Sequence, residues 1–288
     1  MRRLTGSKWA AVLAAAVVGV MALAAPVVSW AKDLPDYLYD RGKGVPSSIF
    51  GTYIEKGDRL FYLYYEYYYD KTDEYSPQDF GFPDSGDYFG KSIENEFLIF
   101  LGYGLTEDIA LELEAAYYTT KNLQKDPDDL SGMPDSIEES GLGDVESQVR
   151  WRWKDETESS PELFSFFEVV FPFQENKQII GTQDWELSLG FGAIKGLSWG
   201  TVTGRFSVVW TTESDEFESG EYGVEYLKKI SDSWSVLAAV EGTEDEVELI
   251  GESQHALSES ATLKLNTAFG LTKKAGDFAP EIGIMWRF

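Results

Sequence analysis

Hydrophobic and polar residues alternate along most of the chain after residue 58. In the last eight residues, 281–288, every even position holds Ile, Trp or Phe, and the odd positions hold Glu, Gly, Met and Arg. Successive side chains of a β-strand point to opposite faces of a sheet, so this period of two predicts a strand with one apolar face.

The same alternation predicts twelve strands. They cover residues 60–69, 93–103, 109–119, 143–154, 163–171, 185–194, 200–210, 222–230, 234–242, 247–255, 261–271 and 279–288. Each has about the nine to twelve residues that a tilted strand needs to cross a bilayer. Only helices and closed barrels satisfy all backbone polar groups in hydrocarbon, so strands in a membrane must close into a barrel. We therefore predict an all-β, up-and-down antiparallel transmembrane β-barrel of about twelve strands.

The connections between these strands alternate in length. Long segments, 70–92, 121–142, 174–183 and 211–221, fall at one end, and short turns near 106–108, 195–197 and 231–233 fall at the other. Bacterial barrels have long external loops and short periplasmic turns. The exceptions are 155–162, which is long for a turn, and 243–246, which is short for a loop. A soluble two-sheet sandwich is the alternative, but Trp and Tyr at strand ends favour the interfacial girdles of a membrane barrel.

The first 31 residues have the order of a secretory signal peptide. Basic residues come first, an Ala- and Val-rich stretch follows from Ala10 to Val28, and small residues end at Ala31. An uncleaved membrane anchor is the alternative, because the apolar stretch is just long enough to span. Residues 32–58 are then an N-terminal extension, a plug inside the barrel, or an extra short strand around 49–53. The barrel domain is 59–288, in the cell outer membrane.

Charge and composition exclude several classes of protein. Removing residues 1–31 takes away three of the 24 basic residues and no acidic one, which leaves 21 against 50. Such an acidic surface repels nucleic acid. The chain has no cysteine, so neither disulfides nor thiolate metal sites stabilise it. Aromatic residues facing lipid and charged residues facing a lumen account for both the 15% aromatic and the 26% charged content.

Several short Gly-containing motifs carry a family resemblance. They are Tyr103-Gly104-Leu105-Thr106 leading to Tyr118, Gly141-Leu142-Gly143-Asp144 leading to Val149-Arg150-Trp151-Arg152, and Phe171-Pro172 with the segment 181–192. Over roughly half of the mature chain, the sequence resembles the outer-membrane family labelled "MetA-pathway of phenol degradation". The resemblance implies a transporter-like barrel and brings no catalytic residue to this chain.

The faces predicted to point into the lumen are rich in carboxylates, with fewer basic residues and two tyrosines. The predicted lumen-lining residues are Glu66, Glu94, Glu96, Glu112, Glu114, Glu146, Glu168, Glu186, Glu225, Glu241, Glu248, Glu281, Arg150, Arg152, Arg205, Lys264, Arg287, Tyr62 and Tyr64. In a water-filled lumen, an excess of carboxylates favours cations. The alternative is an ion-paired network that fills the barrel, since twelve strands lie between filled and open barrels. Tyr62 and Tyr64 are equally consistent with a slide for an aromatic solute and with plain packing.

Other candidate chemistry is weaker. Glu112 and Glu114 share a face and could act as an acid/base pair only if their environments differed. His255, the only histidine, has Ser253 on the same strand face, but no third orienting group is evident. The acidic segments 126–129 and 213–221 lack the spacing of an EF-hand loop. We therefore predict no catalytic residue, no metal site and no cofactor.

The sequence thus predicts a monomeric outer-membrane channel that passes small solutes, by a porin-like route or facilitated diffusion, with apolar or aromatic compounds as candidates. Its expected partners are outer-membrane lipid, a small-molecule solute and, through the C-terminal strand ending at Phe288, the barrel-assembly machinery. A non-conducting structural or surface-interaction barrel is the main alternative. A lipid-acting barrel hydrolase centred on His255 is the third.

Overall fold

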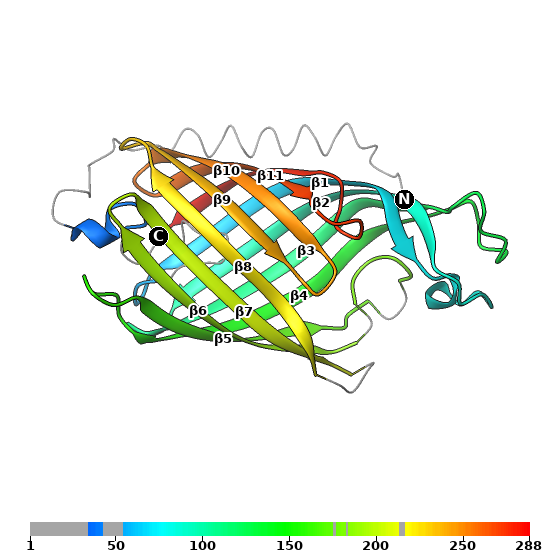
Figure 1. The fold of residues 1–288 in the computed structure, drawn as a ribbon, viewed down its shortest axis with the longest axis horizontal. Helices are drawn as coiled ribbons and strands as arrows, with labels where there is room; N and C mark the ends of the chain where they lie inside the picture. The colour runs from blue at the N-terminus through cyan, green and yellow to red at the C-terminus, as the bar shows by residue number, and fades with distance from the viewer. Residues whose placement is uncertain (1–33, 43–53, 175–176, 183, 213–216) are drawn as a thin grey trace, which may run out of the picture.

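The structure, a computed structural model, describes residues 34–42, 54–174, 177–182, 184–212 and 217–288. Twelve antiparallel strands form a closed barrel (Figure 1). The strands are β1 Arg59–Tyr75, β2 Tyr88–Gly104, β3 Ile109–Gln124, β4 Ser136–Lys154, β5 Glu162–Phe171, β6 Glu186–Leu197, β7 Gly200–Thr211, β8 Phe217–Lys229, β9 Trp234–Gly242, β10 Val247–Ser258, β11 Ala261–Gly270 and β12 Ala279–Arg287. Two short 3₁₀ helices, η1 Asp36–Leu38 and η2 Pro77–Phe80, complete the described secondary structure. No helix among these residues is long and apolar enough to cross a membrane.

Strand β1 closes the barrel by pairing with both β2 and β12. Its register with β12 runs from Leu60 opposite Arg287 to Glu66 opposite Glu281. Each strand from β2 to β11 pairs with its two neighbours in the sequence, and β12 pairs with β11 and β1. The predicted twelve-strand antiparallel barrel is therefore confirmed. The predicted signal peptide and the possible strand at 49–53 lie outside the described residues.

The first four strands are longer than alternation predicted, so those boundaries were wrong. At the long-loop end, β1 continues to Tyr75, β3 continues to Gln124, and β4 begins at Ser136. The predicted loops 70–92 and 121–142 are correspondingly shorter. These strand ends lie beyond the level of the other strands (Figure 1), where no lipid imposes an apolar outer face. At these ends the strands are still paired, but hydrophobic and polar residues no longer alternate along them.

A small hydrophobic cluster holds these projecting strand ends together. Tyr75, Leu123, Met133 and Ile137 are buried in it. The Tyr75 hydroxyl donates to Asp129 Oδ2 at 2.9 Å and accepts from the Asp126 N–H at 2.9 Å. The external end of β1 to β4 is thus a packed unit rather than a set of independent loops.

Acid should loosen this unit only at low pH. Burial works to raise the pKa of the Asp129 carboxyl, but hydrogen bonds from Ser131 and from the Tyr75 hydroxyl hold that pKa below its ordinary value of 3.8. A carboxyl whose pKa is depressed by folding stabilises above its unfolded pKa and loses that contribution as pH falls through the folded value. We expect amide protection in residues 129–133 to be equal at pH 5 and pH 7 and to fall below about pH 4. Loss of protection already at pH 5 would contradict this assignment.

Inward-facing glycines make room for aromatic rings inside the barrel. Phe164 and Phe166 on β5 stand opposite Gly192 and Gly190 on β6. A Cβ atom added at either glycine would overlap the ring opposite it. Both rings are buried and, with Ile194, form a hydrophobic cluster on the inner wall. The lumen side of the sheet is therefore packed like a core at this position.

Filling one of these positions should destabilise the barrel. Gly192→Leu forces the side chain into Phe164, and overpacking of this kind costs about 1–3 kcal/mol. Gly251→Leu is a matched control, because nothing lies within 4 Å of a Cβ at Gly251. We expect the control to change stability by less than about 0.5 kcal/mol. Urea titration of the two variants in lipid vesicles measures the difference, and equal midpoints would contradict the packing described here.

Candidate functional site

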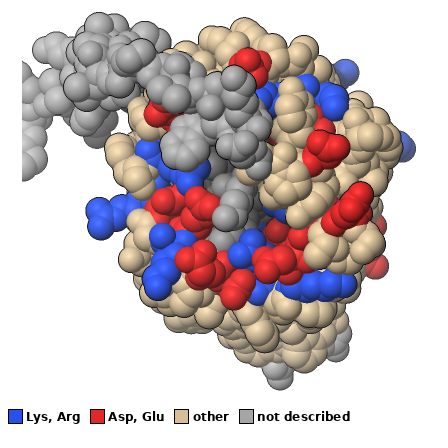
Figure 2. Space-filling model, turned by 90° about the vertical axis from the view of Figure 1, so that its left-hand side faces the viewer, with Lys and Arg blue, Asp and Glu red and all other residues tan. Residues whose placement is uncertain are grey.

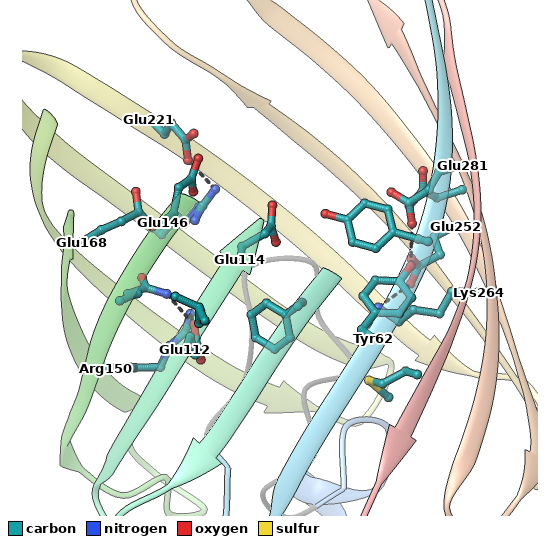
Figure 3. A pocket seen from close by; sticks show the side chains of 17 residues that line it. Tyr62, Glu112, Glu114, Glu146, Arg150, Glu168, Glu221, Glu252, Lys264 and Glu281 are labelled. Atoms are coloured by element: carbon teal, nitrogen blue, oxygen red, sulfur yellow. Dashed lines mark hydrogen bonds and ion pairs between the residues drawn. The ribbon is translucent and has the colours of Figure 1, made fainter. Parts of the chain in front are cut away.

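A cavity of about 290 Å³ lies in the lumen, enclosed by side chains from both walls of the barrel (Figure 3). Its lining residues are Tyr62, Tyr64, Phe100, Glu112, Leu113, Glu114, Glu146, Gln148, Arg150, Glu168, Arg205, Glu221, Glu252, Lys264, Asn266, Glu281 and Met285. Most are at alternate positions of their strands, because only every second side chain of a strand points into the lumen. The cavity is thus a direct product of the period-two pattern.

Each basic residue of the cavity has a carboxylate partner. Arg150 Nε lies 3.4 Å from Glu112 Oε1, and both side chains are buried. Lys264 Nζ lies 3.4 Å from Glu252 Oε1 in an equally buried pair. Arg205 Nη2 lies 2.6 Å from Glu221 Oε2, nearer to solvent. Three of the carboxylates are therefore neutralised locally.

Four other lining carboxylates have no basic partner within 4 Å among the described residues: Glu114, Glu146, Glu168 and Glu281. Glu114 and Glu146 stand directly opposite each other on β3 and β4. Like charges in that position destabilise a sheet. The cavity therefore holds four carboxyl groups without a basic partner among the described residues, and those that are ionised together repel one another.

A further row of carboxylates lies at the level of Glu281. Glu66 on β1 stands opposite Glu281 on one side and Glu96 on the other. The Glu96 side chain is buried, and its Oε2 has no hydrogen-bond partner among the described residues. The negative character of the cavity thus continues along the inner wall.

The opposite wall of the cavity is partly aromatic. Tyr62 and Tyr64 stack with ring centroids 4.6 Å apart. The Tyr62 hydroxyl donates to Glu281 Oε1, and Lys264 Nζ lies 5.4 Å from the centre of the Tyr62 ring. Tyr62 and Phe100 pack against the apolar cluster that contains Ile54 and Met285. The cavity therefore has Glu114, Glu146 and Glu168 on one side, and ring faces together with Glu252 and Glu281 on the other (Figure 3).

The structure gathers ten of the predicted lumen residues around the cavity and places nine elsewhere. The ten are Tyr62, Tyr64, Glu112, Glu114, Glu146, Arg150, Glu168, Arg205, Lys264 and Glu281. The nine that do not line it are Glu66, Glu94, Glu96, Arg152, Glu186, Glu225, Glu241, Glu248 and Arg287.

Most of these nine have local partners. Lys121 Nζ lies 2.8 Å from Glu94, and Glu241 lies 3.9 Å from Arg205. Glu225 is buried in the wall of β8. Arg152 and Arg287 form ion pairs at the short-turn end, with Asp108 and Asp155 and with Glu55 and Asp58, respectively.

The segment 34–42 lies against the turns at the short-turn end, which faces the periplasm in barrels of this kind. Acidic and basic side chains alternate around this end (Figure 2). Arg41 Nη2 lies 3.0 Å from Glu156 and 2.9 Å from Glu162, and all three side chains are at most 4% exposed. Asp40 accepts a hydrogen bond from the Lys229 N–H at 2.9 Å. Buried ion pairs and a hydrogen bond thus hold the segment against the turns of the barrel.

Residues 54–58 make a second contact with the inner wall. Ile54 is fully buried, and a Cβ added at Gly102 or Gly104 would overlap Ile54 or the backbone of Glu55. The two glycines therefore provide the space in which this segment lies against β2.

Sequence reasoning missed several residues of these two sites. The same alternation directs four uncharged side chains into the lumen, but nothing in their chemistry marks them as part of a site. They are Phe100, Gln148, Asn266 and Met285. Glu221 was assigned to a loop. Arg41 and its partners, Glu156 and Glu162, lie in segments without alternation, and nothing in the sequence pairs residues more than a hundred positions apart.

The remaining candidate chemistry finds no support in the geometry. The His255 ring stacks on Trp234 with centroids 4.4 Å apart, and its Nδ1 lies 3.1 Å from the backbone oxygen of Ser233. No contact joins it to the Ser253 side chain among the described interactions. In the part of the chain that the structure describes, no group of three or more His, Cys, Asp or Glu side chains could hold a metal ion.

A closed barrel of twelve tilted antiparallel strands, with apolar residues outside and charges inside, defines an outer-membrane β-barrel. No protein-family model and no curated protein matches the sequence. Among solved structures, the chain is similar to the COG4313 outer membrane channel from Pseudomonas putida F1, with 15% identity and a TM-score of 0.60 over 82% of this chain and 97% of that one. It is also similar to the KdgM porin in complex with disordered oligogalacturonate, with 6% identity and a TM-score of 0.50 over 80% and 99%. These likenesses establish the fold, and with it the location of the protein in the outer membrane.

Proposed function

We propose that this barrel passes small solutes across the outer membrane and favours cations. The observation that carries the proposal is a set of four lumen carboxylates with no basic partner within 4 Å among the residues that the structure describes: Glu114, Glu146, Glu168 and Glu281. A barrel that needs only a filled interior has no use for facing carboxylates, because they repel each other. Charged rings of one sign are the usual means by which a pore selects its ions.

The fold supports this proposal without naming the solute. One of the similar structures is described as an outer membrane channel and the other as a porin. The resemblance to the family labelled "MetA-pathway of phenol degradation" favours solutes with an apolar or aromatic part. The stacked pair of Tyr62 and Tyr64 provides a surface for such a part.

We further propose that residues 32–58 act as a plug at the periplasmic end. The described parts of this segment lie against the barrel at two places, through Arg41 at the turns and through Ile54 on the inner wall of β2. Passage then depends on how firmly these contacts hold. A monomeric state, and recognition of the last strand with Phe288 by the assembly machinery, remain further proposals; Phe288 is 72% exposed and pairs with Arg59 through its backbone.

A filled structural barrel is the second candidate, and a specific observation favours it. Apolar side chains form clusters on the inner wall, one around Ile54, Leu60 and Met285 and another around Leu227, Leu237 and Ile250. The buried side chains of these clusters take up space inside the barrel. A barrel of this kind would fold and remain closed to solutes.

Single-channel recording separates the two candidates. The refolded protein is placed in a planar bilayer across a tenfold KCl gradient. Stable steps with a reversal potential on the cation side support the proposal. A protein that shows the β-signal in circular dichroism but gives no steps, in the full chain and after removal of residues 1–58, would overturn it.

A further inference from the structure

We infer that the lumen cavity is a binding site for a small organic monocation, an amine that carries an apolar or aromatic group. The inference deepens the proposed function, on which it rests, because it names the class of solute that the lumen holds during passage. Four features of the cavity support it: the number of carboxylates, an unsatisfied buried oxygen of Glu252, the ring faces and the volume.

The charge of the cavity calls for a cation. Seven carboxylates line it, against three basic side chains, each of which is already paired. Figure 3 shows that Glu114 on β3, Glu146 on β4 and Glu168 on β5 face the same cavity as Tyr62. A positively charged ligand removes the repulsion among these groups. An anion would be repelled by the same groups.

A carboxylate oxygen of Glu252, in the cavity wall, lacks a hydrogen-bond partner in the part of the chain that the structure describes. The Glu252 side chain is fully buried, and its Oε1 contacts both Lys264 and Gln254. Its Oε2 is buried without a hydrogen-bond partner among the described residues. Leaving a buried acceptor unsatisfied is unfavourable. An N–H group of a bound ligand can satisfy it.

The aromatic wall shows how the ligand's cationic group can bind. Lys264 already places an ammonium 5.4 Å from the centre of the Tyr62 ring while it pairs with Glu252. This is the arrangement of a cation–π contact. A ligand ammonium near Glu114 and Glu146 has the same two kinds of partner, a carboxylate and the tyrosine pair. Phe100 and Met285 add an apolar surface for the rest of the ligand.

Size and geometry exclude two other occupants. A cavity of about 290 Å³ is at the lower end of the range for small-molecule sites, roughly 300–1,000 Å³. A large or oligomeric solute would not fit inside it. The carboxylates are spread over the wall, and no group of three among the described residues could hold a metal ion. The site therefore fits an organic cation better than a divalent metal.

Calorimetric titration with three probes of one shape tests the inference. Benzylammonium is the cation, benzyl alcohol its neutral counterpart and benzoate the anion, each added to the refolded full chain in detergent. We expect benzylammonium to bind at least tenfold more tightly than either of the other probes. The double variant Glu146→Gln/Glu168→Gln should weaken benzylammonium at least tenfold. The variant Glu138→Gln/Glu218→Gln removes the same charge from exposed positions and should bind as the unchanged protein does.

Equal binding of benzyl alcohol, unchanged binding in the lumen double variant, or no binding of benzylammonium would overturn the inference. Circular dichroism confirms that each variant is folded, and the substitutions keep side-chain shape. Conductance of the same preparations separates this inference from the proposed function. Cation-selective steps without benzylammonium binding would reject the site and keep the channel, whereas binding in a silent barrel would keep the site and reject the channel.

Discussion

Replacing Arg41 with alanine is expected to release the segment 34–42 from the barrel and to raise the conductance of the pore. Arg41 is the closest basic partner of Glu162, at 2.9 Å, and the next one, Arg152, is 4.0 Å away. Removing one partner of a buried ion pair costs about 3–5 kcal/mol, because the remaining charge stays buried. Glu156 is less affected, since Lys195 Nζ also lies 3.1 Å from it.

The loss of stability should affect the segment 34–42 and not the unfolding of the whole barrel. If the segment leaves its place, water reaches Glu162, so the loss cannot exceed the free energy that holds the segment. We expect faster amide exchange in residues 36–42, an unchanged urea midpoint for the strands, and larger single-channel steps. Arg59→Ala is the control, because Arg59 is an exposed arginine at the same end of the barrel. If amide exchange and single-channel step size are both unchanged in Arg41→Ala, then Arg41 does not hold the segment 34–42 in place and the segment does not plug the pore.

Neutralising Glu114, Glu146 and Glu168 together, each by Gln, should abolish most of the cation preference of the pore. At roughly 8 Å and an effective dielectric constant of about 20, one fixed charge acts on a passing ion with about 2 kcal/mol. A change of about 1.4 kcal/mol is a factor of ten in a ratio of populations. The cation-to-anion permeability ratio should therefore fall at least tenfold, which moves the reversal potential toward zero.

Two controls make this result specific. Glu138→Gln/Glu218→Gln changes the external charge only and should leave the reversal potential where it was. Raising the KCl concentration should reduce selectivity in the unchanged protein, because mobile ions in a water-filled lumen screen the fixed charges of its wall. A triple variant as cation-selective as the original would mean that the selecting charges lie elsewhere.

The strands were predictable because lipid and lumen impose different chemistry on alternate residues. Segments such as 234–242 and 279–288 carry that pattern along their whole length, and their observed bounds differ by at most one residue from the prediction. The ends of β1 and β4 were missed because they leave the membrane, where both faces of a strand can be polar. Alternation reports the environment of a strand, and pairing continues after that environment changes.

Inward direction was predictable for the charged residues, but their partners were not. The alternation put Glu112 and Arg150 on the lumen side, yet their contact depends on the register of β3 against β4. The pairing of Arg41 with Glu162 depends on a chain segment outside the strands, which lies against the turns of the barrel. Contacts of this kind join residues far apart in the sequence and follow only from the closed three-dimensional arrangement.

The pairing of inward rings with inward glycines also bears on how the barrel is assembled. Phe164, Phe166 and Tyr64 each stand opposite a glycine of the neighbouring strand. A shift of one residue would turn a whole strand inside out, and a shift of two would set a ring against a larger side chain or leave its glycine uncovered. Each ring–glycine pair therefore makes the correct register of two strands more favourable than a shifted one during insertion. The barrel, which has no cysteines, gains this specificity from packing alone.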